Sequence, residues 1–321
     1  MQPTVLVTGA NGFVGTALAV ELERRGYPVV RATRQGAGAG ERATGEIGPD
    51  TDWSGVLTGV DVIIHTAARV HVMRDTTADP AAAFHRVNAA GTRRLADQAA
   101  QAGVRRLVFL STIKVNGEAT NNQRPFTAAD TPAPADDYAR SKRAAEQSLH
   151  EISTTTGLET TIIRPPLVYG PGAGGNVQRL LRLVERGVPL PLARVNNRRS
   201  FIALDNLVDL LIRCVDHPAA AGETFLAADG EDLSTPGLIR LMAAAMGRPA
   251  RLFPMPVPGL RAAAAVVGRR HVAARLLDSL RIDTTHTRER LDWAPPVSPS
   301  DAMRRLTGQG GTAQPARGPA P

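Results

Sequence analysis

The chain begins with a short apolar segment that runs directly into a glycine-rich loop. Residues 4–8 are strand-like, and the following loop, TGANGFVG at residues 8–15, has Gly9, Gly12 and Gly15 at regular spacing. Glycines at this spacing permit a tight turn and a close approach of the backbone to a pyrophosphate, which then lies against the free N–H groups of the following helix. The loop therefore predicts a dinucleotide site. The residues expected to line it are Gly9, Asn11, Gly12, Phe13, Val14 and Gly15.

Segments rich in β-branched residues alternate with segments of helical spacing through the first half of the chain. The strand-like segments are residues 4–8, 29–33, 60–66, 107–111 and 160–164, and the helical ones are 15–25, 84–102 and 138–156. This alternation predicts an α/β fold in which a doubly wound parallel sheet carries helices on both faces. Sheets of this kind bind ligands at the carboxyl ends of their strands.

The amino-acid composition changes after Arg164, where prolines and glycines become frequent. We therefore expect a dinucleotide-binding domain over residues 1–167 and a second, smaller substrate-binding lobe over residues 168–307, with residues 200–216 returning to the sheet. Residues 308–321 are rich in Gly, Pro, Ala and Gln without an apolar period, which predicts a disordered tail.

Composition argues against several classes of protein. Apolar residues make up 43% and charged residues 21%, as in ordinary globular domains. The net charge of +8 comes from scattered residues with only 4% aromatics, so we expect no nucleic-acid partner. No export signal and no apolar run of membrane-spanning length is visible, which predicts a soluble, cytoplasmic protein without a membrane partner. The histidines are dispersed and Cys214 is the single cysteine, so we expect a buried thiol and no metal site.

Only two of the 38 basic residues are lysines, Lys114 and Lys142. Lys142 follows Tyr138 by four positions, so on a helix both side chains project from one face. An ammonium one turn away favours the phenolate and brings the pKa of the phenol toward the working range. Tyr138 and Lys142 are therefore a candidate acid-base pair. This chemistry also gives a reason for Lys at position 142, because Arg cannot supply a compact, tunable ammonium.

Further motifs follow the glycine loop in a fixed order. They are DVIIHTAA at residues 61–68, VNAAGT at 87–92, LSTIKVNG at 110–117, YARSK at 138–142, RPPLVYGP at 164–171 and RSFI at 199–202. Together they resemble the extended short-chain dehydrogenase/reductase family, which has a Rossmann-type fold and whose members mostly act on nucleotide-linked sugars. The resemblance covers residues 4–306. It implies a UDP-sugar substrate, a nicotinamide cofactor and a homodimer formed through two helices of each subunit.

The resemblance also assigns roles around the catalytic pair. Thr112 matches the catalytic Ser/Thr of the family, whose hydroxyl donates to the substrate oxygen beside the tyrosine, and Ser111 is the second candidate or a strand-end hydroxyl. Ala67 and Asn88 fall on the cofactor side, with Asn88 either stabilising the sheet near the site or lying on a helix surface. His65 ends an apolar strand, which favours a packed, hydrogen-bonded ring over a titrating one.

On the substrate side, the resemblance points to arginine and amide groups of the second lobe. Arg199 matches the residue that clamps the diphosphate, a group that suits the guanidinium fork, and Arg198 is its neighbouring competitor. Asn176 matches a polar residue close to it. His71 follows the strand end at residue 66 and is expected to face the sugar.

The two residues that follow Thr112 narrow the choice of reaction. Family members that eliminate water carry an Asp-Glu pair after the catalytic Thr, where this chain has Ile113 and Lys114, so a dehydratase is not expected. A 4-keto reductase and a C4 epimerase remain. We expect a hydride transfer at C4 of a UDP-(N-acetyl)hexosamine, with reduction of a UDP-4-keto-6-deoxy-N-acetylhexosamine as the first expectation. In that reaction Lys114 would add positive charge near the developing alkoxide. The other role considered for Lys114 is to anchor its loop. The alternative is a UDP-glucose or UDP-N-acetylglucosamine 4-epimerase. A non-catalytic NAD(P)-sensing protein is the alternative from another class.

The end of the second strand bears on the cofactor. An acid about 20 residues after a dinucleotide loop binds the ribose 2′-hydroxyl of NAD, whereas an arginine accommodates the 2′-phosphate of NADP. The second strand ends in Arg31, Ala32, Thr33 and Arg34, with no acid before Glu41. Arg34, with Arg31 as second choice, therefore predicts NADP(H) over NAD(H), and this cofactor in turn favours the reductase.

Overall fold

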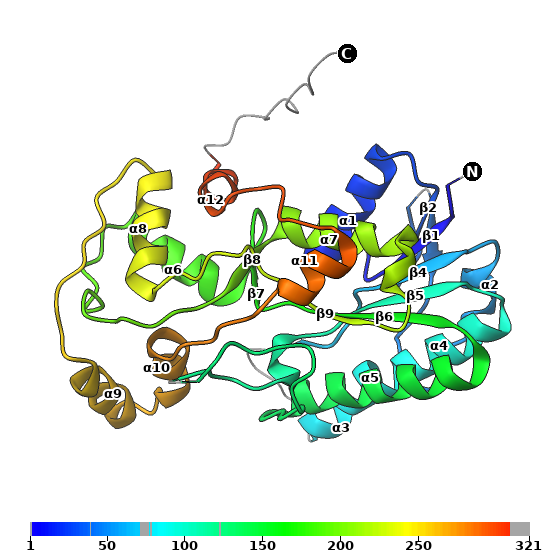
Figure 1. Ribbon diagram of the computed structural model, residues 1–321, viewed down its shortest axis with the longest axis horizontal. Helices are drawn as coiled ribbons and strands as arrows, with labels where there is room; N and C mark the ends of the chain where they lie inside the picture. Colours follow the sequence, from blue (N-terminus) through cyan, green and yellow to red (C-terminus); the bar gives the residue numbers. More distant parts are fainter. Residues whose placement is uncertain (1, 39, 71–76, 78, 122, 309–321) are drawn as a thin grey trace, which may run out of the picture.

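The computed structural model describes residues 2–308 except 39, 71–76, 78 and 122, and it contains a seven-stranded sheet in which every pairing is parallel (Figure 1). The strand order is β3-β2-β1-β4-β5-β6-β9. The strands are β1 (Val5–Thr8), β2 (Val29–Thr33), β3 (Glu41–Ala43), β4 (Val62–His65), β5 (Arg106–Leu110), β6 (Glu159–Arg164) and β9 (Thr224–Leu226). The chain leaves β1 toward β2 and then returns to β4 on its other side. The switch point of this doubly wound sheet therefore lies between β1 and β4.

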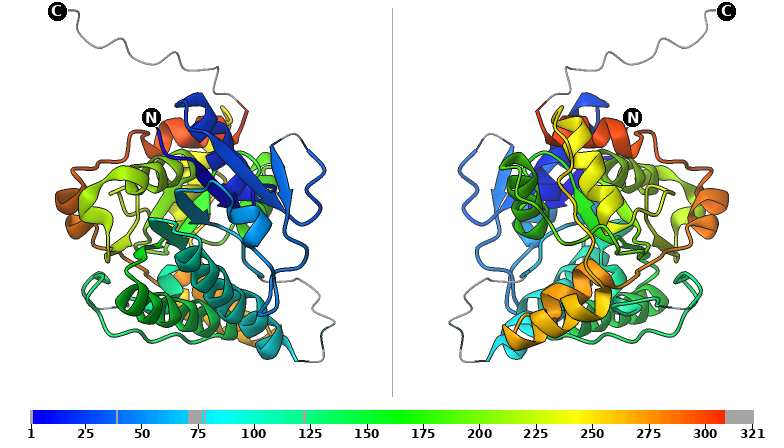
Figure 2. Two further views of the ribbon diagram at one scale, coloured as in Figure 1. Left: turned by 90° about the vertical axis from the view of Figure 1, so that its right-hand side faces the viewer. Right: turned by 90° about the vertical axis from the view of Figure 1, so that its left-hand side faces the viewer.

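Helices cover both faces of the sheet (Figures 1 and 2). Alternate residues of a strand point to opposite faces, so Val5 and Val7 pack into one core and Leu6 into the other. The first core is closed by α1 (Phe13–Arg24) and α7 (Leu204–Asp216). The second is closed by α2 (Ser54–Leu57), α4 (Gly91–Gln101) and α5 (Asp137–Thr156). Both layers bury apolar side chains that are fully inaccessible, which makes the sheet a rigid support for residues at its edges.

A second lobe is built around a separate apolar cluster. It contains a two-stranded parallel sheet of β7 (Leu167–Tyr169) and β8 (Phe201–Ala203). Its helices are α6 (Gly175–Glu185), α8 (Thr235–Ala245), α9 (Val257–Val266), α10 (Arg270–Leu277) and α12 (Pro299–Leu306), while α11 (Thr285–Leu291) packs near β9. Within the described ranges, no helix is long and apolar enough to cross a membrane.

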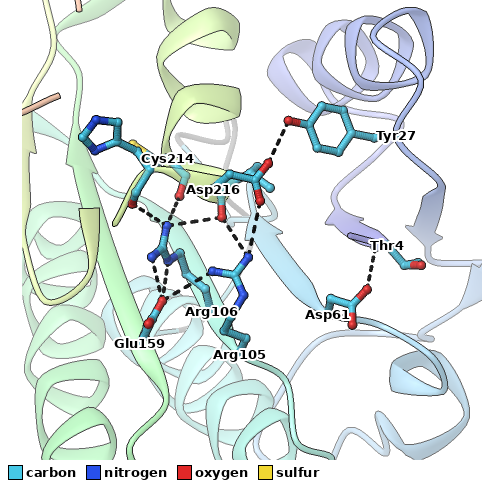
Figure 3. Close-up of polar contacts among 10 residues, drawn as sticks. Thr4, Tyr27, Asp61, Arg105, Arg106, Glu159, Cys214 and Asp216 are labelled. Carbon is cyan, nitrogen blue, oxygen red and sulfur yellow. Dashed lines mark hydrogen bonds and ion pairs between the residues drawn. The ribbon is translucent and has the colours of Figure 1, made fainter. Parts of the chain in front are cut away.

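The amino ends of the strands carry a charged cluster (Figure 3). The buried Arg106 side chain is paired with Glu159 at 2.7 Å, and its Nη1 donates to the carbonyl oxygens of Cys214 at 2.8 Å and His217 at 2.9 Å. These carbonyls end α7, so Arg106 satisfies a helix C-terminus that would otherwise be buried without partners. Cys214 is fully buried, as expected, and burial raises the pKa of its thiol to about 12. This edge stabilises the fold and lies opposite the motif loops.

The five expected strands agree with β1, β2, β4, β5 and β6 within about two residues, and the helices expected over residues 15–25 and 138–156 agree with α1 and α5. Residues 200–216 were expected to return to the sheet: α7 packs on the main sheet, whereas β8 pairs with β7 outside it. Strands β3 and β9 of the main sheet were not expected. The expected helix over residues 84–102 is three consecutive pieces, α3 (Pro80–Phe84), a π-helical segment over His85–Ala90, and α4. The domain limits at residues 167 and 307 stay predictions, and residues 309–321 lie outside the described part of the chain.

Candidate active site

The glycine loop forms a cradle between β1 and β4 in which side chains do not fit. Gly9 has a φ of +66°, and a Cβ there would lie 2.9 Å from the backbone N and Cα of Ala67. A Cβ on Gly15 would lie 2.1 Å from the carbonyl oxygen of Gly9. Real Cβ atoms do not come this close, so both positions require glycine. Thr66 holds the facing loop in place by donating from Oγ1 to the carbonyl oxygen of Thr8 at 2.6 Å.

The cradle fits a dinucleotide phosphate. Helix α1 starts directly after it, and its N-cap residue is Gly12, which has no side chain to satisfy the first backbone amides. These amides and the positive end of the helix dipole form an anion site at the switch point of the sheet. Asn11 is exposed there, while Phe13 and Val14 are half-buried. The residues expected to line the dinucleotide site are thus assembled in one loop, and their contact with the cofactor stays a prediction.

Tyr138 and Lys142 lie one turn apart in the first half of α5, whose start is capped by the Asp136 side chain accepting from the Ala139 amide at 2.7 Å. The Tyr138 ring meets the edge of the Phe84 ring, with 6.1 Å between centroids. Lys142 is only 2% exposed, and its Nζ lies 4.0 Å from the centroid of the Phe109 ring on β5. The ammonium is therefore held over an aromatic face, where a cation is favoured.

The pKa of Tyr138 differs from the expectation. Burial raises the pKa of the Tyr138 phenol to about 12, with Asp136 adding to the effect, instead of the lowering expected from Lys142. Burial also lowers the pKa of the Lys142 ammonium to about 7. Both shifts have the same cause, because a low-dielectric surrounding disfavours the charged form of each group. Without a further positive charge in the site, the phenol is a neutral proton donor.

Thr112 follows the end of β5 and caps a 3-10 turn over Ile113–Val115, its Oγ1 accepting from the Lys114 amide at 3.3 Å. This turn, which directly follows Thr112, packs against α5. The Lys114 side chain is ion-paired with Asp136 and, at 3.1 Å, with Glu118. Lys114 therefore anchors the loop to the start of α5, which is the second of the two roles considered for it.

Glu146 organises a buried polar network that the sequence motifs did not reveal. Its carboxylate, 1% exposed, accepts from Ser111 Oγ at 2.6 Å and from Nε and Nη2 of Arg164 at 2.8 and 2.6 Å. Arg164 Nη1 also donates to Asn116 Oδ1 at 2.9 Å. The network joins the ends of β5 and β6 to α5, one turn beyond Lys142. It occupies the hydroxyl of Ser111, the second catalytic candidate, in a structural bond.

Asn88 and His65 lie in the same region and are fully buried. Asn88 comes from the π-helical segment, and its Nδ2 donates to Ser141 Oγ at 3.0 Å and to the carbonyl oxygen of Arg69 at 2.9 Å. It joins the segment after β4 to the catalytic helix and is not a helix-surface amide. The His65 ring bonds to Thr8 Oγ1 at 2.6 Å and to Thr92 Oγ1 at 3.0 Å. Burial lowers the pKa of His65 to about 3, which agrees with the expected packed histidine.

The substrate-side candidates lie in the second lobe and are less closely assembled. Arg199 is half-buried, its Nη1 donates to the carbonyl oxygen of Asp278 at 3.0 Å, and burial lowers the pKa of its guanidinium. Arg198 is exposed, and Asn176 is exposed near the start of α6. His71 lies outside the described residues.

On the cofactor side, Arg34 is exposed just after β2, whereas Arg31 is paired with Glu23 at 2.8 Å. In the sequence, Glu41 is the first acidic residue after the end of β2. In the structure β3 brings it back, and Glu41 Oε2 accepts from Thr33 Oγ1 at 2.9 Å. A carboxylate therefore does stand at the end of β2, contributed by the neighbouring strand.

A parallel sheet with a glycine cradle at its switch point and a Tyr-Lys pair at the carboxyl edge defines a nicotinamide-dependent oxidoreductase fold of the short-chain dehydrogenase/reductase type. The sequence pattern of the NAD dependent epimerase/dehydratase family matches residues 5–228, and the chain belongs to this family. It is therefore an enzyme of that family, which sets aside the non-catalytic sensor.

Similarity to individual proteins extends over nearly the whole chain. A UDP-glucose 4-epimerase of Vibrio cholerae is 40% identical over 310 residues, which are 95% of this chain and 94% of the relative. The crystal structure of a UDP-N-acetylglucosamine 4-epimerase from Bacillus cereus matches with a TM-score of 0.80 at 20% identity, covering 97% of this chain and 100% of that one. A UDP-glucuronic acid 4-epimerase from Bacillus cereus in complex with NAD matches with a TM-score of 0.76 at 20% identity, covering 95% and 98%. The two structures support the fold.

Proposed function

We propose that the protein interconverts the C4 epimers of a UDP-hexose such as UDP-glucose or UDP-N-acetylglucosamine. The observation that carries the proposal is the Tyr138-Lys142 pair on α5, with the turn after Thr112 packed against the same helix, in a chain that is 40% identical to a UDP-glucose 4-epimerase over 310 residues. Arg199 is the proposed ligand of the substrate diphosphate. Its guanidinium is half-buried in the second lobe, and a guanidinium can bind phosphate oxygens through two parallel hydrogen bonds. A homodimer, measurable by light scattering, is part of the proposal.

The side chains of the site divide the proton chemistry between them. The Thr112 hydroxyl donates to the C4 oxygen and holds it toward Tyr138. Tyr138 accepts the C4 hydroxyl proton during oxidation and returns it to the 4-keto oxygen during reduction, so no proton is consumed over a cycle. Bound NAD⁺ supplies the hydride acceptor and a positive charge. That charge, together with the Lys142 ammonium, counteracts the burial that raises the pKa of Tyr138 in the protein alone.

Reduction of a UDP-4-keto-6-deoxy-N-acetylhexosamine, the first expectation, has less support. It relied on Lys114 beside a developing alkoxide and on Arg34 as a ligand of NADP. The Lys114 ammonium is instead ion-paired with the carboxylates of Asp136 and Glu118. The similarity along the chain is also to a protein described as a 4-epimerase.

The assay that tests the proposal offers purified protein UDP-glucose and, separately, UDP-N-acetylglucosamine without added reductant. We expect the C4 epimer of at least one of them. A Tyr138→Phe variant should lose at least about 100-fold of turnover, the scale of a positioned acid-base group, while keeping its fold. Stoichiometric NADPH consumption with a UDP-4-keto-6-deoxy sugar, and no epimer from either UDP-hexose, would replace the epimerase by the reductase.

For the cofactor we propose NAD rather than NADP. Glu41, held beside Thr33, would place a negative charge near the 2′-phosphate of NADP, whereas a ribose 2′-hydroxyl can donate to it. An epimerase also recovers its own hydride and gains from retaining one NAD through the cycle. We expect tighter binding of NAD than of NADP to the wild type, and a Glu41→Gln variant should narrow the difference. If the wild type preferred NADP and Arg34→Ala abolished this preference, the cofactor would be NADP, with Arg34 as the ligand of its 2′-phosphate.

A further inference from the structure

One long segment of the second lobe contains no acidic residue. Between Asp232 and Asp278 the chain has no Asp or Glu. The same 45 residues contain seven arginines, Arg240, Arg248, Arg251, Arg261, Arg269, Arg270 and Arg275. All seven side chains are exposed. The protein as a whole carries +8, so this one segment holds a large share of the excess positive charge.

The same segment also exposes apolar side chains. Helix α9 has the sequence VPGLRAAAAV, and none of its residues is buried. Val266 and Val267 at its end are 87% and 66% exposed, the highest values among the exposed large apolar residues of the described chain. Phe253, shortly before the helix, is also exposed. Exposed apolar residues usually occur singly, so this grouping points to an interaction surface.

The apolar and basic side chains meet at the turn between α9 and α10. Val266 and Val267 are followed by Gly268, with a φ of +66°, and then by Arg269 and Arg270. We call residues 266–270 the α9–α10 tip. Figure 1 shows α9 and α10 at the end of the molecule farthest from β1 and β2, and the right-hand view of Figure 2 looks onto this end. The tip therefore lies away from the dinucleotide-binding sheet, and all five of its residues are exposed.

We propose that the α9–α10 tip docks the protein on an anionic lipid surface, in contrast to the expectation from the sequence that it has no membrane partner. Aliphatic side chains flanked by arginines match the acyl-headgroup boundary, where apolar groups insert shallowly and guanidinium groups remain with the lipid phosphates. A nucleic acid would use the arginines but leave the two valines exposed to water. A second copy of this chain would bring two acid-free, positively charged segments together, which is unfavourable. Lipid satisfies both chemistries at once.

Docking at the tip would place the substrate side of the enzyme next to the membrane. Arg261 of α9 is paired with the Asp278 carboxylate at 2.5 Å, and Arg199 donates to the carbonyl oxygen of the same residue at 3.0 Å. Asp278 thus links the docking helix to Arg199. This inference does not depend on the reaction proposed above, because lipid binding can be measured without any substrate.

The test is co-sedimentation of the full chain with vesicles of equal parts phosphatidylglycerol and phosphatidylcholine, compared with pure phosphatidylcholine. We expect binding to the anionic vesicles that falls as salt rises. Arg269→Gln with Arg270→Gln should weaken binding roughly tenfold or more. Val266→Ser with Val267→Ser should weaken it as well, at unchanged charge.

Matched controls keep the test independent of folding and of general charge. Val20→Ser removes an exposed valine from α1, and Arg86→Gln with Arg93→Gln removes two exposed arginines elsewhere. These variants should bind vesicles like the wild type, and all variants should keep the wild-type thermal midpoint because the side chains are exposed. The proposal is overturned by equal sedimentation with both kinds of vesicle, by no sedimentation, or by tip variants that bind no less than the controls.

Discussion

Lys142 is the residue at which the chemistry of the site and the stability of the fold oppose each other. Its ammonium is buried over Phe109, and burial lowers its pKa from 10.5 to about 7. In the unfolded chain the amine stays protonated up to about pH 10.4. The folded protein therefore binds fewer protons than the unfolded chain between about pH 7 and pH 10. Its stability should rise with pH across this window, and the full cost of burying the charge is felt below it.

A Lys142→Met variant should therefore be inactive and more stable. Removing the buried charge is expected to stabilise the fold by roughly 1–4 kcal/mol at pH 6, and the gain should shrink toward pH 9 as the wild-type amine becomes neutral. Urea unfolding of both proteins at the two pH values measures this. A variant that is less stable at pH 6, or a gain that grows with pH, would contradict the assigned pKa shift.

At the scale of single residues, the sequence pointed to candidate site residues but did not predict their pKa values or charge partners. Local spacing singled out Tyr138 and Lys142, and the family resemblance singled out Thr112, because these patterns span a few neighbouring positions. Their catalytic roles stay predictions. The pKa of Tyr138 was predicted in the wrong direction, since burial depends on what distant segments cover the side chain. The role of Lys114 was open for the same reason, as its partner Asp136 lies 22 residues away.

At the scale of elements, α5 is the helix on which the site depends. Its apolar period predicted residues 138–156, close to the observed Asp137–Thr156. The Glu146 network could not be predicted, because its partners Ser111 and Arg164 come from the ends of two different strands. The π-helical segment and strands β3 and β9 were missed for a related reason. Each is set by long-range pairing or packing, which leaves no periodic pattern in the local sequence.

A Glu146→Gln variant tests this network. It leaves the Arg164 guanidinium buried without its charged partner, so we expect a loss of about 3–5 kcal/mol in the free energy of unfolding. Glu151→Gln is the matched control on the same helix, since its carboxylate is exposed and pairs with the exposed Arg93. The control should change stability by less than about 0.5 kcal/mol. Equal effects of the two variants would mean that the buried pair contributes no more than a surface one.

At the scale of the whole molecule, we propose that the first lobe binds the cofactor and the second lobe binds the substrate. The sheet with its glycine cradle offers the anion site at the start of α1, and the second lobe contributes Arg199 on the substrate side. The order of the motifs predicted this division, since the cofactor motifs precede residue 167 and the substrate motif begins at residue 199. We expect the choice of sugar to depend on side chains of the second lobe. His71, which precedes that lobe and was also expected to face the sugar, lies outside the described residues.

In the proposed reaction, the hydride removed from C4 returns to the same carbon. Conversion of UDP-glucose carrying deuterium at C4, followed by NMR of the product, tests this return. We predict the C4 epimer with deuterium retained at C4 and without any net change in added nicotinamide cofactor. An epimer with hydrogen at C4, or a 4-keto product with the deuterium left on the cofactor, would contradict it.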